Sequence, residues 1–331
     1  GIDSGIVTIL ASDFHHEHLK TLSLYFKEEQ FSEKKYQDSV IEQLHCSHYQ
    51  HLLTEAEFGN SFAGILQAMD MPSCDGLNTW FISKCAKQQG LKAVLSGIGG
   101  DELFGGYPSF ARISIAEQLR IMPPSTLKFG RNSNVKRINR LPYLSLPGVK
   151  GLYLFLRGMF MPGEIAKQLG ASEKEVWNIL SDHPVLPVLN GLSPKNKASW
   201  IEMNMYMQNQ LLRDADVMSM AHGIEIRVPF LDHDFVKTVT AIDSDVKYKG
   251  HLPKQLLINA FKDKLPESVW NRQKMGFAFP FTQWLTHNDF VKDTMENGNA
   301  NTQLNYKKFK EGRLHWSHLM SLIILKTRGV N

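Results

Sequence analysis

Short apolar runs and longer amphipathic segments alternate over the first hundred residues. The short runs are rich in β-branched, aromatic and leucine side chains, which predicts strands. They span 21–26, 48–53 and 92–96. Beside them, apolar residues recur every three or four positions, which predicts helices. These helices span 4–12, 33–44, 55–69 and 77–89. Alternating strands and helices are typical of βαβ units, so we expect an α/β fold with a doubly wound parallel sheet.

The pattern changes after about residue 108, where helical spacing dominates. The helices predicted in this part span 109–121, 163–169, 172–181, 195–222, 233–241, 253–263, 280–296 and 314–328. We therefore expect a helix-rich part, 109–331, that packs onto the α/β part, 1–108, as an extension of one unit.

Composition narrows the class of protein. The chain has 43% hydrophobic and 21% charged residues, which is ordinary for a soluble globular protein. A net charge of +4 gives no support to nucleic-acid binding, and no stretch of about 18 uncharged apolar residues predicts a membrane span. The three cysteines lack CxxC spacing, which indicates free thiols in a reducing compartment. A cytoplasmic location is therefore expected.

The stretch 95–107, LSGIGGDELFGGY, carries the clearest candidate chemistry. It follows directly on a predicted strand, and its glycines expose backbone N–H groups that can hold phosphate oxygens. Asp101 and Glu102 then supply hard oxygen ligands of the kind that Mg²⁺ prefers. Phosphate donors and magnesium ligands at the carboxyl end of a strand predict a nucleotide site in an open α/β sheet.

Four segments together resemble a known family. The first residues, GIDS at 1–4, resemble the end of the SGGxDS pyrophosphate loop of ATP pyrophosphatases. Three blocks resemble, in order and spacing, the synthetase domain of asparagine synthetase-like, glutamine-hydrolysing amidotransferases. They are SGIGGDELFGGY at 96–107, SMAHGIEIRVPFLDH at 219–233 and NRQKMGFAFP at 271–280. The resemblance covers nearly the whole chain, 1–331, whereas the P-loop pattern GxxxxGK[ST] is absent.

The resemblance implies a fold and a domain organisation. It implies the parallel sheet of the adenine nucleotide alpha-hydrolase-like, or ATP pyrophosphatase, type, with 109–331 completing the site. The nucleotide-binding part, 1–108, is expected to lack its first strand. The family's N-terminal glutaminase domain is expected to be absent, because its nucleophile is an amino-terminal cysteine and this chain begins with glycine. Ammonia would then come from that domain or from a separate glutaminase, and a homodimer is one arrangement that fits.

The resemblance also implies an activity, that of an ATP-dependent amide-forming ligase. A substrate carboxylate attacks the α-phosphate of ATP, which gives an acyl-adenylate and pyrophosphate. Ammonia then displaces AMP to form an amide. A carboxylate is a poor acylating agent, and adenylation supplies a good leaving group. Mg²⁺ neutralises the charge of the departing pyrophosphate.

Site residues follow from the family's motifs, position by position. Asp3 and Asp101 are expected to hold Mg²⁺ and the pyrophosphate, with Asp101 also counted as catalytic; a turn residue and a capping acid are the alternatives. Glu102 is expected either to assist them or to be a carboxylate at a helix N-terminus. Lys274 matches the family's catalytic lysine, which would stabilise charge on the α-phosphate, whereas a solvated loop lysine is the alternative. Arg272 is expected to assist it or to pair with an acid.

The nucleotide itself is expected to be held by a second group of residues. Ser4, together with Gly1, would donate to phosphate from a helix N-terminus, although Ser4 is also predicted as an N-cap. Leu24 matches an apolar position that contacts adenine, and a core role is its alternative. The remaining predicted contacts come from the glycine loop, at Ser96, Gly97, Gly99 and Gly100.

Other charged residues in and near the matching blocks are explained as well by structural or solvent-exposed roles as by functional ones. Glu225, Arg227 and Asp232 are predicted to form a structural ion-pair network around a buried turn. A preceding helix carries candidates for substrate contact, for which a solvated face is the alternative. They are Arg213, Asp214 and Asp216.

Two positions depart from the family's pattern and predict a changed acceptor. Ile98 stands where asparagine synthetase has a glutamate and β-lactam synthetase a tyrosine, and Gln210 stands where the family usually has an acid. The segment 72–79 also differs from the family's substrate loop. The chain also resembles asparagine synthetase-like proteins associated with amidating sugar acids for surface polysaccharides, and this resemblance implies that activity as an alternative. Another ligase of the superfamily and a non-catalytic nucleotide-binding remnant are further alternatives, although a remnant predicts loss of Asp101 or Lys274.

Overall fold

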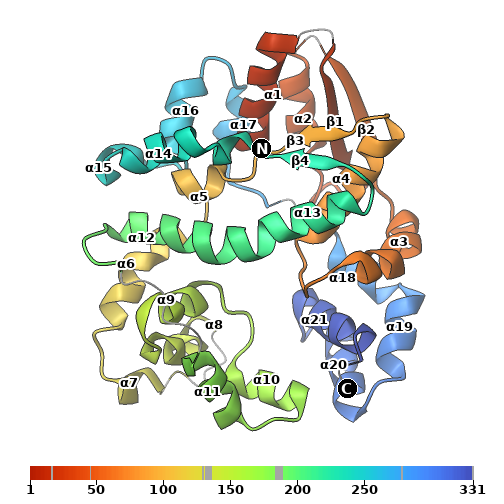
Figure 1. The fold of residues 1–331 in the computed structure, drawn as a ribbon. Helices are drawn as coiled ribbons and strands as arrows, with labels where there is room; N and C mark the ends of the chain where they lie inside the picture. Colours follow the sequence, from red (N-terminus) through yellow and green to blue (C-terminus); the bar gives the residue numbers. More distant parts are fainter. Residues whose placement is uncertain are drawn as a thin grey trace. The chain divides into compact units, whose positions relative to one another are not determined.

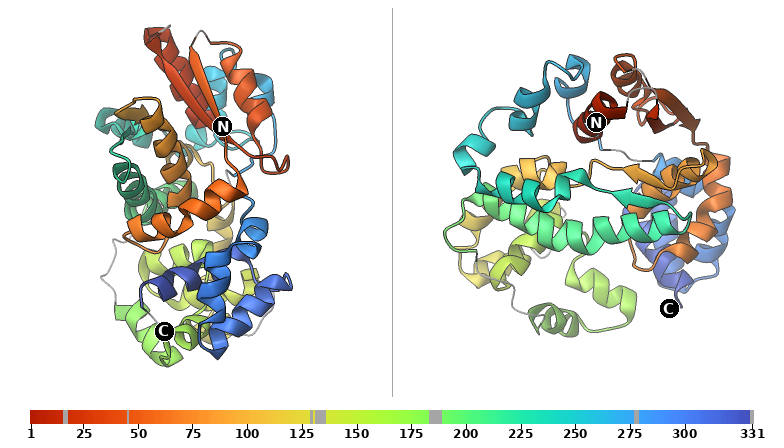
Figure 2. Two further views of the ribbon diagram at one scale, coloured as in Figure 1. Left: turned by 90° about the vertical axis from the view of Figure 1, so that its right-hand side faces the viewer. Right: turned by 45° about the horizontal axis from the view of Figure 1, so that its top comes forward.

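The strands of the protein pair in parallel, as the sequence predicts. In the computed structural model the described residues are 1–15, 18–44, 46–128, 130, 136–182, 189–276 and 279–329, and this part of the chain holds four strands. They are β1 (Lys20–Tyr25), β2 (Ser47–Leu52), β3 (Ala93–Leu95) and β4 (Glu225–Arg227) (Figure 1). β1 and β2 lie side by side in both views of Figure 2, with Lys20 opposite Ser47. β3 pairs with β4, with Ala93 opposite Glu225.

The strand pairs confirm three predicted strands and add one. β4 has only three residues, two of them exposed and charged, so no period-2 pattern marks it. The four strands form two separate parallel pairs rather than one sheet. The protein is therefore a helix-rich α/β structure, and the doubly wound sheet stays a prediction.

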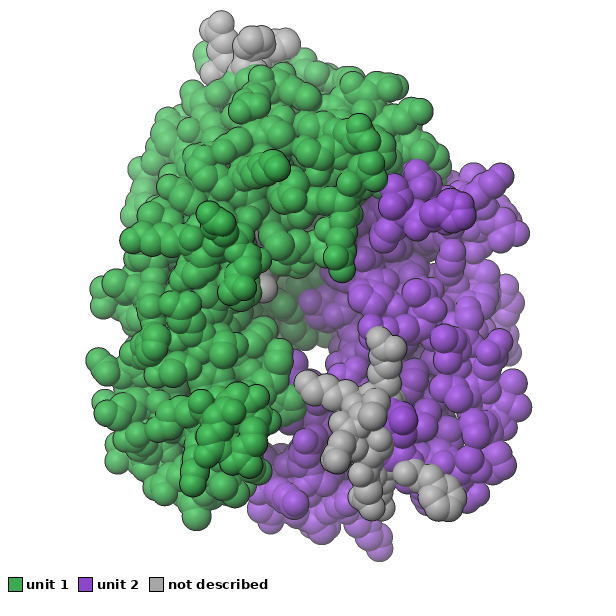
Figure 3. Space-filling model, turned by 180° about the vertical axis from the view of Figure 1, so that it is seen from behind, with its two compact units in different colours: residues 1–100, 208–239, 256–331 green, residues 101–207, 240–255 purple. Residues whose placement is uncertain are grey.

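Contacts within the chain divide it into two units, coloured separately in Figure 3. Unit 1 comprises residues 1–100, 208–239 and 256–331, and unit 2 comprises residues 101–207 and 240–255. The bounds of these units differ from those of the predicted parts, 1–108 and 109–331. The predicted parts were defined by their roles in nucleotide binding, and those roles stay a prediction.

The helices of unit 1 include the four that the sequence predicts around its strands. These are α1 (Ile2–His15), α2 (Lys34–Ile41), α3 (Glu55–Ala68) and α4 (Gly76–Gln88). α1 begins at Ile2 instead of after Ser4, so the prediction that Ser4 is an N-cap is wrong. Ser4 lies inside the first turn, where its hydroxyl donates to the carbonyl of Gly1 (3.3 Å).

The remaining helical segments of unit 1 lie towards the end of the chain, and two of them extend a few residues into unit 2. They are α13 (Leu212–Met220), η5 (Pro229–Leu231), α14 (His233–Ala241), α16 (Gln255–Phe261), α17 (Glu267–Trp270), α18 (Phe281–Thr286), α19 (Asp289–Glu296), α20 (Ala300–Lys310) and α21 (Trp316–Thr327). The single helix predicted over 280–296 is two helices, because Asn288 caps a new start by accepting from the N–H of Val291 (3.0 Å).

An aromatic core holds unit 1 together. Phe58 of α3 lies 5.1–6.5 Å, between ring centroids, from its aromatic neighbours. These neighbours are Phe62, Phe81, Phe279, Phe281 and Trp284. Leu24 of β1 and Leu53 after β2 belong to the same cluster. The β1–β2 pair is thus anchored by burial of apolar side chains from helices at both ends of the sequence.

Unit 2 is built from helices. It contains α6 (Ser109–Leu119), α7 (Pro124–Lys128), α8 (Lys136–Asn139), η3 (Leu141–Ser145), α9 (Gly148–Arg157), α10 (Pro162–Leu169), α11 (Glu173–Asp182), α12 (Pro194–Ile201) and α15 (Ser244–Lys247). α5 (Gly100–Phe104) and η4 (Glu202–Leu211) pass from one unit into the other. The long helix predicted over 195–222 is α12, η4 and α13 in succession, with a π-helix in the middle. No helix in the described part of the chain is both long and apolar enough to cross a bilayer.

Candidate active site

The glycine loop after β3 packs directly on the first turn of α1. A Cβ built on Gly97 would lie 2.7 Å from the backbone nitrogen of Ser4 and 2.9 Å from the Cβ of Asp3. A Cβ on Gly100 would lie 2.6 Å from the carboxyl carbon of Asp3. Real side chains do not approach this closely, so only glycine permits the contact. The structure therefore brings together the two segments, 1–4 and 96–100, that the sequence singled out separately.

The block 219–233 holds that loop in place. β4 runs beside β3, and the N–H of Ser96 donates to the carbonyl of Arg227 (2.8 Å). Gly99 has a φ of +103°, and a Cβ there would lie 3.0 Å from the Cβ of Phe230 in η5. Both constraints require glycine at position 99. Parallel pairing places the carboxyl ends of β3 and β4 at one edge, which is where α/β sheets bind ligands.

The charged residues of this block have simpler roles than a buried network. Glu225 and Arg227 pair with each other (2.9 Å), but their side chains are 62% and 63% exposed. An exposed pair of this kind contributes little to stability. Asp232 caps α14, since its carboxylate accepts from the N–H groups of Asp234 and Phe235 (both 3.1 Å). The predicted ion pair between Glu225 and Arg227 is thus present but exposed, and Asp232 is a helix cap instead of a member of a network.

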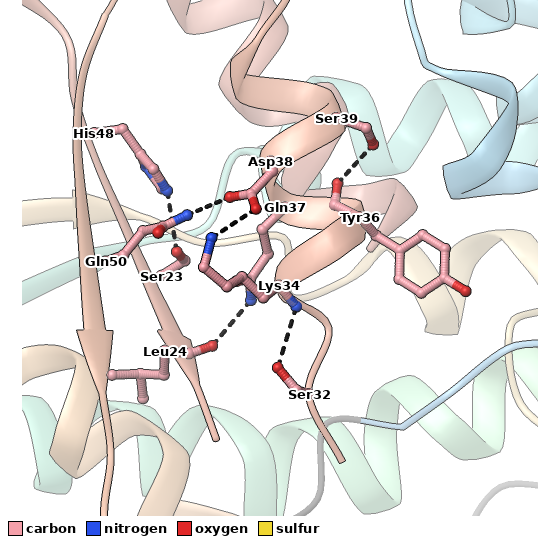
Figure 4. A network of polar contacts seen from close by, with 10 residues as sticks. All are labelled: Ser23, Leu24, Ser32, Lys34, Tyr36, Gln37, Asp38, Ser39, His48 and Gln50. Carbon is pink, nitrogen blue, oxygen red and sulfur yellow. Dashed lines mark hydrogen bonds and ion pairs between the residues drawn. The ribbon is translucent and has the colours of Figure 1, made fainter. Parts of the chain in front are cut away.

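Leu24 lies in the core of unit 1, where 4% of its surface is exposed. Figure 4 shows the polar contacts around it: the side chain of Gln37 in α2 donates to the carbonyl of Leu24 (3.0 Å), and Lys34 pairs with Asp38 one turn apart (2.7 Å). The first contact ties α2 to β1, whereas the ion pair lies within α2. A core role explains Leu24 by itself, and its contact with adenine stays a prediction.

Asp101 begins unit 2 and forms an ion pair with Lys254. The lysine is 6% exposed and has a φ of +60°, the one positive φ of a non-glycine residue in the described part of the chain. Gly106 makes room for the pair, because a Cβ there would lie 2.5 Å from Cε of Lys254. The N–H groups of Gly105 and Gly106 donate to the carbonyl of Asp101 (3.1 and 2.9 Å). Sequence reasoning missed Lys254, since a single lysine at a predicted helix start is ordinarily exposed.

Lys274 lies between α17 and α18, in a segment without regular secondary structure, and it is exposed. Arg272 anchors this segment: it pairs with Glu33, and its guanidinium lies 3.9 Å from the ring centroid of Tyr36. Arg272 therefore pairs with an acid, as one of its two interpretations predicts. The last residues of the motif, 277–278, lie outside the described residues.

Gln210 takes part in a polar cluster of unit 1 that joins the segment after α3 to the start of α13. Its amide donates to the carboxylate of Asp75 (2.6 Å) and to the hydroxyl of Ser73 (3.4 Å). That hydroxyl in turn donates to the carboxylate of Asp214, which is 3% exposed. Burial, with Asp75 and Asp70 adding repulsion, raises the pKa of Asp214 to about 7, against the hydrogen bond from Ser73 that lowers it. Gln210 thus contacts the carboxylate of Asp75 and is linked through Ser73 to that of Asp214.

The neighbours of Asp214 on α13 behave as a solvated face. Arg213 pairs with Asp70 (2.7 Å), with side chains 52% and 37% exposed, and Asp216 is exposed. Of the three candidates for substrate contact on this helix, only Asp214 is buried.

A comparison with protein families decides the membership of the chain. The family model described as asparagine synthase matches residues 1–320. The chain belongs to the asparagine synthase family. This confirms the resemblance drawn from the motifs at 1–4, 96–107, 219–233 and 271–280.

Curated relatives agree with this family. The chain is 30% identical to asparagine synthetase [glutamine-hydrolyzing] 1 of Bacillus subtilis over 89% of its own length and 48% of that protein. It is 27% identical to a putative asparagine synthetase [glutamine-hydrolyzing] of Mycobacterium tuberculosis over 88% of its length and 46% of that protein. A more distant match, 23% identical over 65% of the chain and 36% of the relative, is amidase chry2 of Gibberella zeae. The chain thus spans about half the length of the two synthetases.

The donor atoms of this asparagine synthase-family chain suit Mg²⁺ held partly by phosphate. Within the described ranges, no three His, Cys, Asp or Glu side chains gather as a protein-only metal site requires. Mg²⁺ in nucleotide sites needs only one or two carboxylates, because the phosphates supply other ligands. Asp3, whose carboxylate lies against Gly100, offers such oxygens beside the glycine loop.

Proposed function

We propose that this asparagine synthase-family chain is an ATP-dependent amide-forming ligase that releases AMP and pyrophosphate. The observation that supports the proposal best is the contact of the glycine loop 96–100 with the first turn of α1 at Asp3 and Ser4. Backbone N–H groups of a glycine loop and of a helix N-terminus form a site for phosphate oxygens. Family membership favours ATP as the source of those phosphates. We also propose that the two parallel strand pairs belong to an ATP pyrophosphatase-type, doubly wound sheet.

The proposed reaction has two steps. An oxygen of the acceptor carboxylate attacks the α-phosphorus of ATP, and the bond from that phosphorus to the oxygen bridging to the β-phosphorus breaks. Pyrophosphate leaves with that bond's electron pair. Ammonia then attacks the carbonyl carbon of the acyl-adenylate, the bond from this carbon to the phosphate oxygen breaks, and AMP leaves. Loss of a proton from nitrogen to the surrounding buffer gives the neutral amide.

Each candidate residue has a proposed task. Gly1, Ser4 and the backbone of Ser96, Gly97, Gly99 and Gly100 bind phosphate oxygens. Asp3 and Asp101 hold Mg²⁺, which, when bound, offsets the negative charge that builds on the departing pyrophosphate. Lys254 orients the carboxylate of Asp101 through their ion pair. Lys274 stabilises charge on the α-phosphate as the acceptor oxygen approaches.

The acceptor is proposed to differ from that of asparagine synthetase. Ile98 brings a hydrocarbon side chain to the glycine loop, and Gln210 uses its amide to bind Asp75. A pocket edged by such groups would contact an acceptor differently from one with acids at both positions. Aspartate is the first candidate by family, and a sugar acid is the second by the resemblance to synthetase-like proteins associated with surface polysaccharides. Ammonia is proposed to come from a glutaminase domain or a separate glutaminase, since the synthetases that the chain matches are described as glutamine-hydrolysing.

The direct test is product analysis with ammonia supplied as ammonium chloride. The protein would be incubated with ATP, Mg²⁺ and a panel of carboxylates that includes aspartate and several sugar acids. AMP and pyrophosphate formed in equal amounts with one acid would support the ligase and identify the acceptor class. ATP binding without AMP formation for every acid would favour a nucleotide-binding remnant.

Replacing Lys274 with alanine tests the lysine in the third block. We expect the rate of AMP formation to fall by about 10²–10³-fold, because a cation aimed at developing charge acts mainly in the transition state. Lys262→Ala removes another exposed lysine of unit 1 and is the matched control. A fall of less than threefold in Lys274→Ala would make Lys274 an ordinary surface residue.

Replacing Gly97 with alanine tests the contact between the loop and α1. The added methyl group cannot occupy its place 2.7 Å from the nitrogen of Ser4, so the loop and the first turn must separate. We expect the dissociation constant for ATP to rise at least about tenfold, measured by calorimetric titration. Gly64→Ala is the control, because a Cβ at position 64 in α3 has no atom within 4 Å. Equal ATP affinity in both variants would contradict a phosphate site at this contact.

A further inference from the structure

Glu102, the residue after Asp101, is held at both ends inside unit 2. Its side chain is 1% exposed, and its carboxylate accepts a hydrogen bond from the hydroxyl of Tyr107 (2.8 Å). Its backbone carbonyl accepts from the hydroxyl of Ser199 in α12 (2.8 Å). The carboxylate is thus enclosed by protein, which argues against a direct role for Glu102 as a metal ligand.

Arg157 of α9 supports Tyr107 from the other side. Its guanidinium carbon lies 4.5 Å from the ring centroid of Tyr107 and 3.5 Å from that of Tyr206. Its Nε donates to the carboxylate of Glu202 (2.6 Å), whose side chain has no exposed surface. The rings of Tyr107 and Tyr206 meet edge to face, with centroids 5.9 Å apart. The guanidinium is therefore fixed by a carboxylate and two aromatic rings.

Burying these charges costs free energy, so packing alone does not explain why the cluster is charged. Glu102 and Glu202 are two carboxylates out of water, and apolar residues of similar size usually stabilise a core at least as well. Buried polar networks instead give directional constraints. Glu202 and Tyr206 lie one turn apart on η4, a π-helix, and such irregular turns are frequent at functional sites.

The cluster limits rotation of α5 about its own axis. Asp101 and Glu102 are consecutive in α5, so their side chains leave the helix about 100° apart. Glu102 is fixed towards Tyr107, and Asp101 is fixed towards Lys254 and Gly106. Rotation of α5 that freed one carboxylate would also displace the other.

We propose that Tyr107, Arg157 and Glu202 are positioning residues that fix Glu102 and thereby orient the carboxylate of Asp101. Tyr107 acts directly on Glu102, Arg157 holds the ring of Tyr107, and Glu202 holds Arg157. This inference rests on the proposed function in one respect: the task of Asp101 is to bind Mg²⁺ with ATP. The hydrogen bonds and the stacking that support the positioning of Glu102 do not depend on what Asp101 binds.

Tyr107→Phe is the sharpest test, because it removes only the hydroxyl that binds Glu102. Tyr143→Phe is the matched control: Tyr143 is also buried in unit 2, and its hydroxyl donates to the carbonyl of Phe160, away from Glu102. Two measurements would be made on each variant and on the unchanged protein. One is hydrogen exchange of the amides of 101–106 without ligand, and the other is ATP affinity with Mg²⁺ and with EDTA.

We expect Tyr107→Phe to speed exchange at 101–106 about fivefold, the effect of losing one hydrogen bond, while Tyr143→Phe leaves these amides unchanged. We also expect Mg²⁺-dependent ATP affinity to fall about five- to tenfold in Tyr107→Phe only, with affinity in EDTA unchanged. Arg157→Lys, which keeps the charge but loses the planar stacking, should give an intermediate effect.

The outcomes separate this inference from the proposed function. Equal exchange and equal Mg²⁺-dependent affinity in the two tyrosine variants would overturn the positioning role. Faster exchange at 101–106 in Tyr107→Phe, combined with no effect of Mg²⁺ on ATP affinity in the unchanged protein, would overturn the task assigned to Asp101 and with it the proposed function. The hydrogen bond of Tyr107 would then still be shown to stabilise α5, but without a role in Mg²⁺ binding.

Discussion

Replacing Asp101 with asparagine is expected to lower pyrophosphate release by about 10³-fold or more. The substitution keeps the size of the side chain but removes the charge that is proposed to hold Mg²⁺, and losses of this order follow removal of a group that stabilises transition-state charge. The measurement is pyrophosphate formed per minute with the acceptor that the carboxylate panel identifies. Release within tenfold of the unchanged protein would remove Asp101 from the metal site.

The same substitution also affects stability, through Lys254. The ammonium of Lys254 is buried against Asp101, and removing one partner of a buried ion pair costs about 3–5 kcal/mol. The double variant Asp101→Asn with Lys254→Met removes both charges, so most of that loss in the free energy of unfolding should return. Pyrophosphate release should stay low in the double variant. A double variant that regained both stability and release would show that Asp101 matters only as a partner of Lys254.

The second large effect concerns stability against pH. Asp214 has a pKa of about 7 in the folded chain and an ordinary value of 3.8 when exposed, because burial disfavours its ionised form. Between these two values the folded state holds a proton that the unfolded state has lost. The free energy of unfolding should therefore fall with rising pH, by about 1.4 kcal/mol per pH unit, and level off above pH 7.

Asp214→Asn should abolish this dependence, since an amide does not titrate and has a similar shape. At pH 8 the variant should be more stable than the unchanged protein by up to about 4 kcal/mol, and near pH 4 the two should be close. Denaturant unfolding at several pH values measures both curves. Asp216→Asn is the control, because Asp216 is exposed on the same helix. Parallel curves for the unchanged protein and Asp214→Asn would show that Asp214 is ionised throughout.

The cluster around Asp214 shows which groups surround Gln210 in the fold. The resemblance implies an acid at position 210, so a glutamine there predicts a changed acceptor. In the structure the amide of Gln210 binds Asp75, and Ser73 links the two to Asp214. Two carboxylates, those of Asp75 and Asp214, thus belong to the cluster that holds Gln210. No spacing rule connects residues 73–75 with 210–214, so only the folded chain shows this cluster.

Local sequence patterns predicted the α/β part closely. The strands at 21–26 and 48–53 match β1 and β2 within one residue. In β1, Leu22 and Leu24 alternate with polar residues, and Leu24 is buried, as the alternating pattern of a strand predicts. The helix predicted over 77–89 is α4, shifted by one residue. The glycine positions of the loop were also evident from sequence. Positions 97, 99 and 100 exclude side chains for reasons of close approach that the motif reflects.

Sequence patterns did not predict features that depend on contacts between residues far apart in the chain. β4 was missed because three residues carry no period, and it exists because β3 supplies its hydrogen bonds. α18 and α19 were merged because both have apolar faces, whereas the break depends on a cap at Asn288. Lys254 gave no signal, because its burial depends on Asp101 and on the missing side chain of Gly106.

By itself the sequence determined the family, the parallel α/β beginning and the positions where the loop 96–100 requires glycine. These features are encoded locally, in periodicity and in short motifs that chemistry restricts to a few residue types. Only the tertiary structure decided which partners the charged groups have: Lys254 with Asp101, Tyr107 with Glu102, and Ser73 with Asp214. A side chain's pKa and orientation depend on burial and on neighbours brought from far along the chain, and neither is written in the residues beside it.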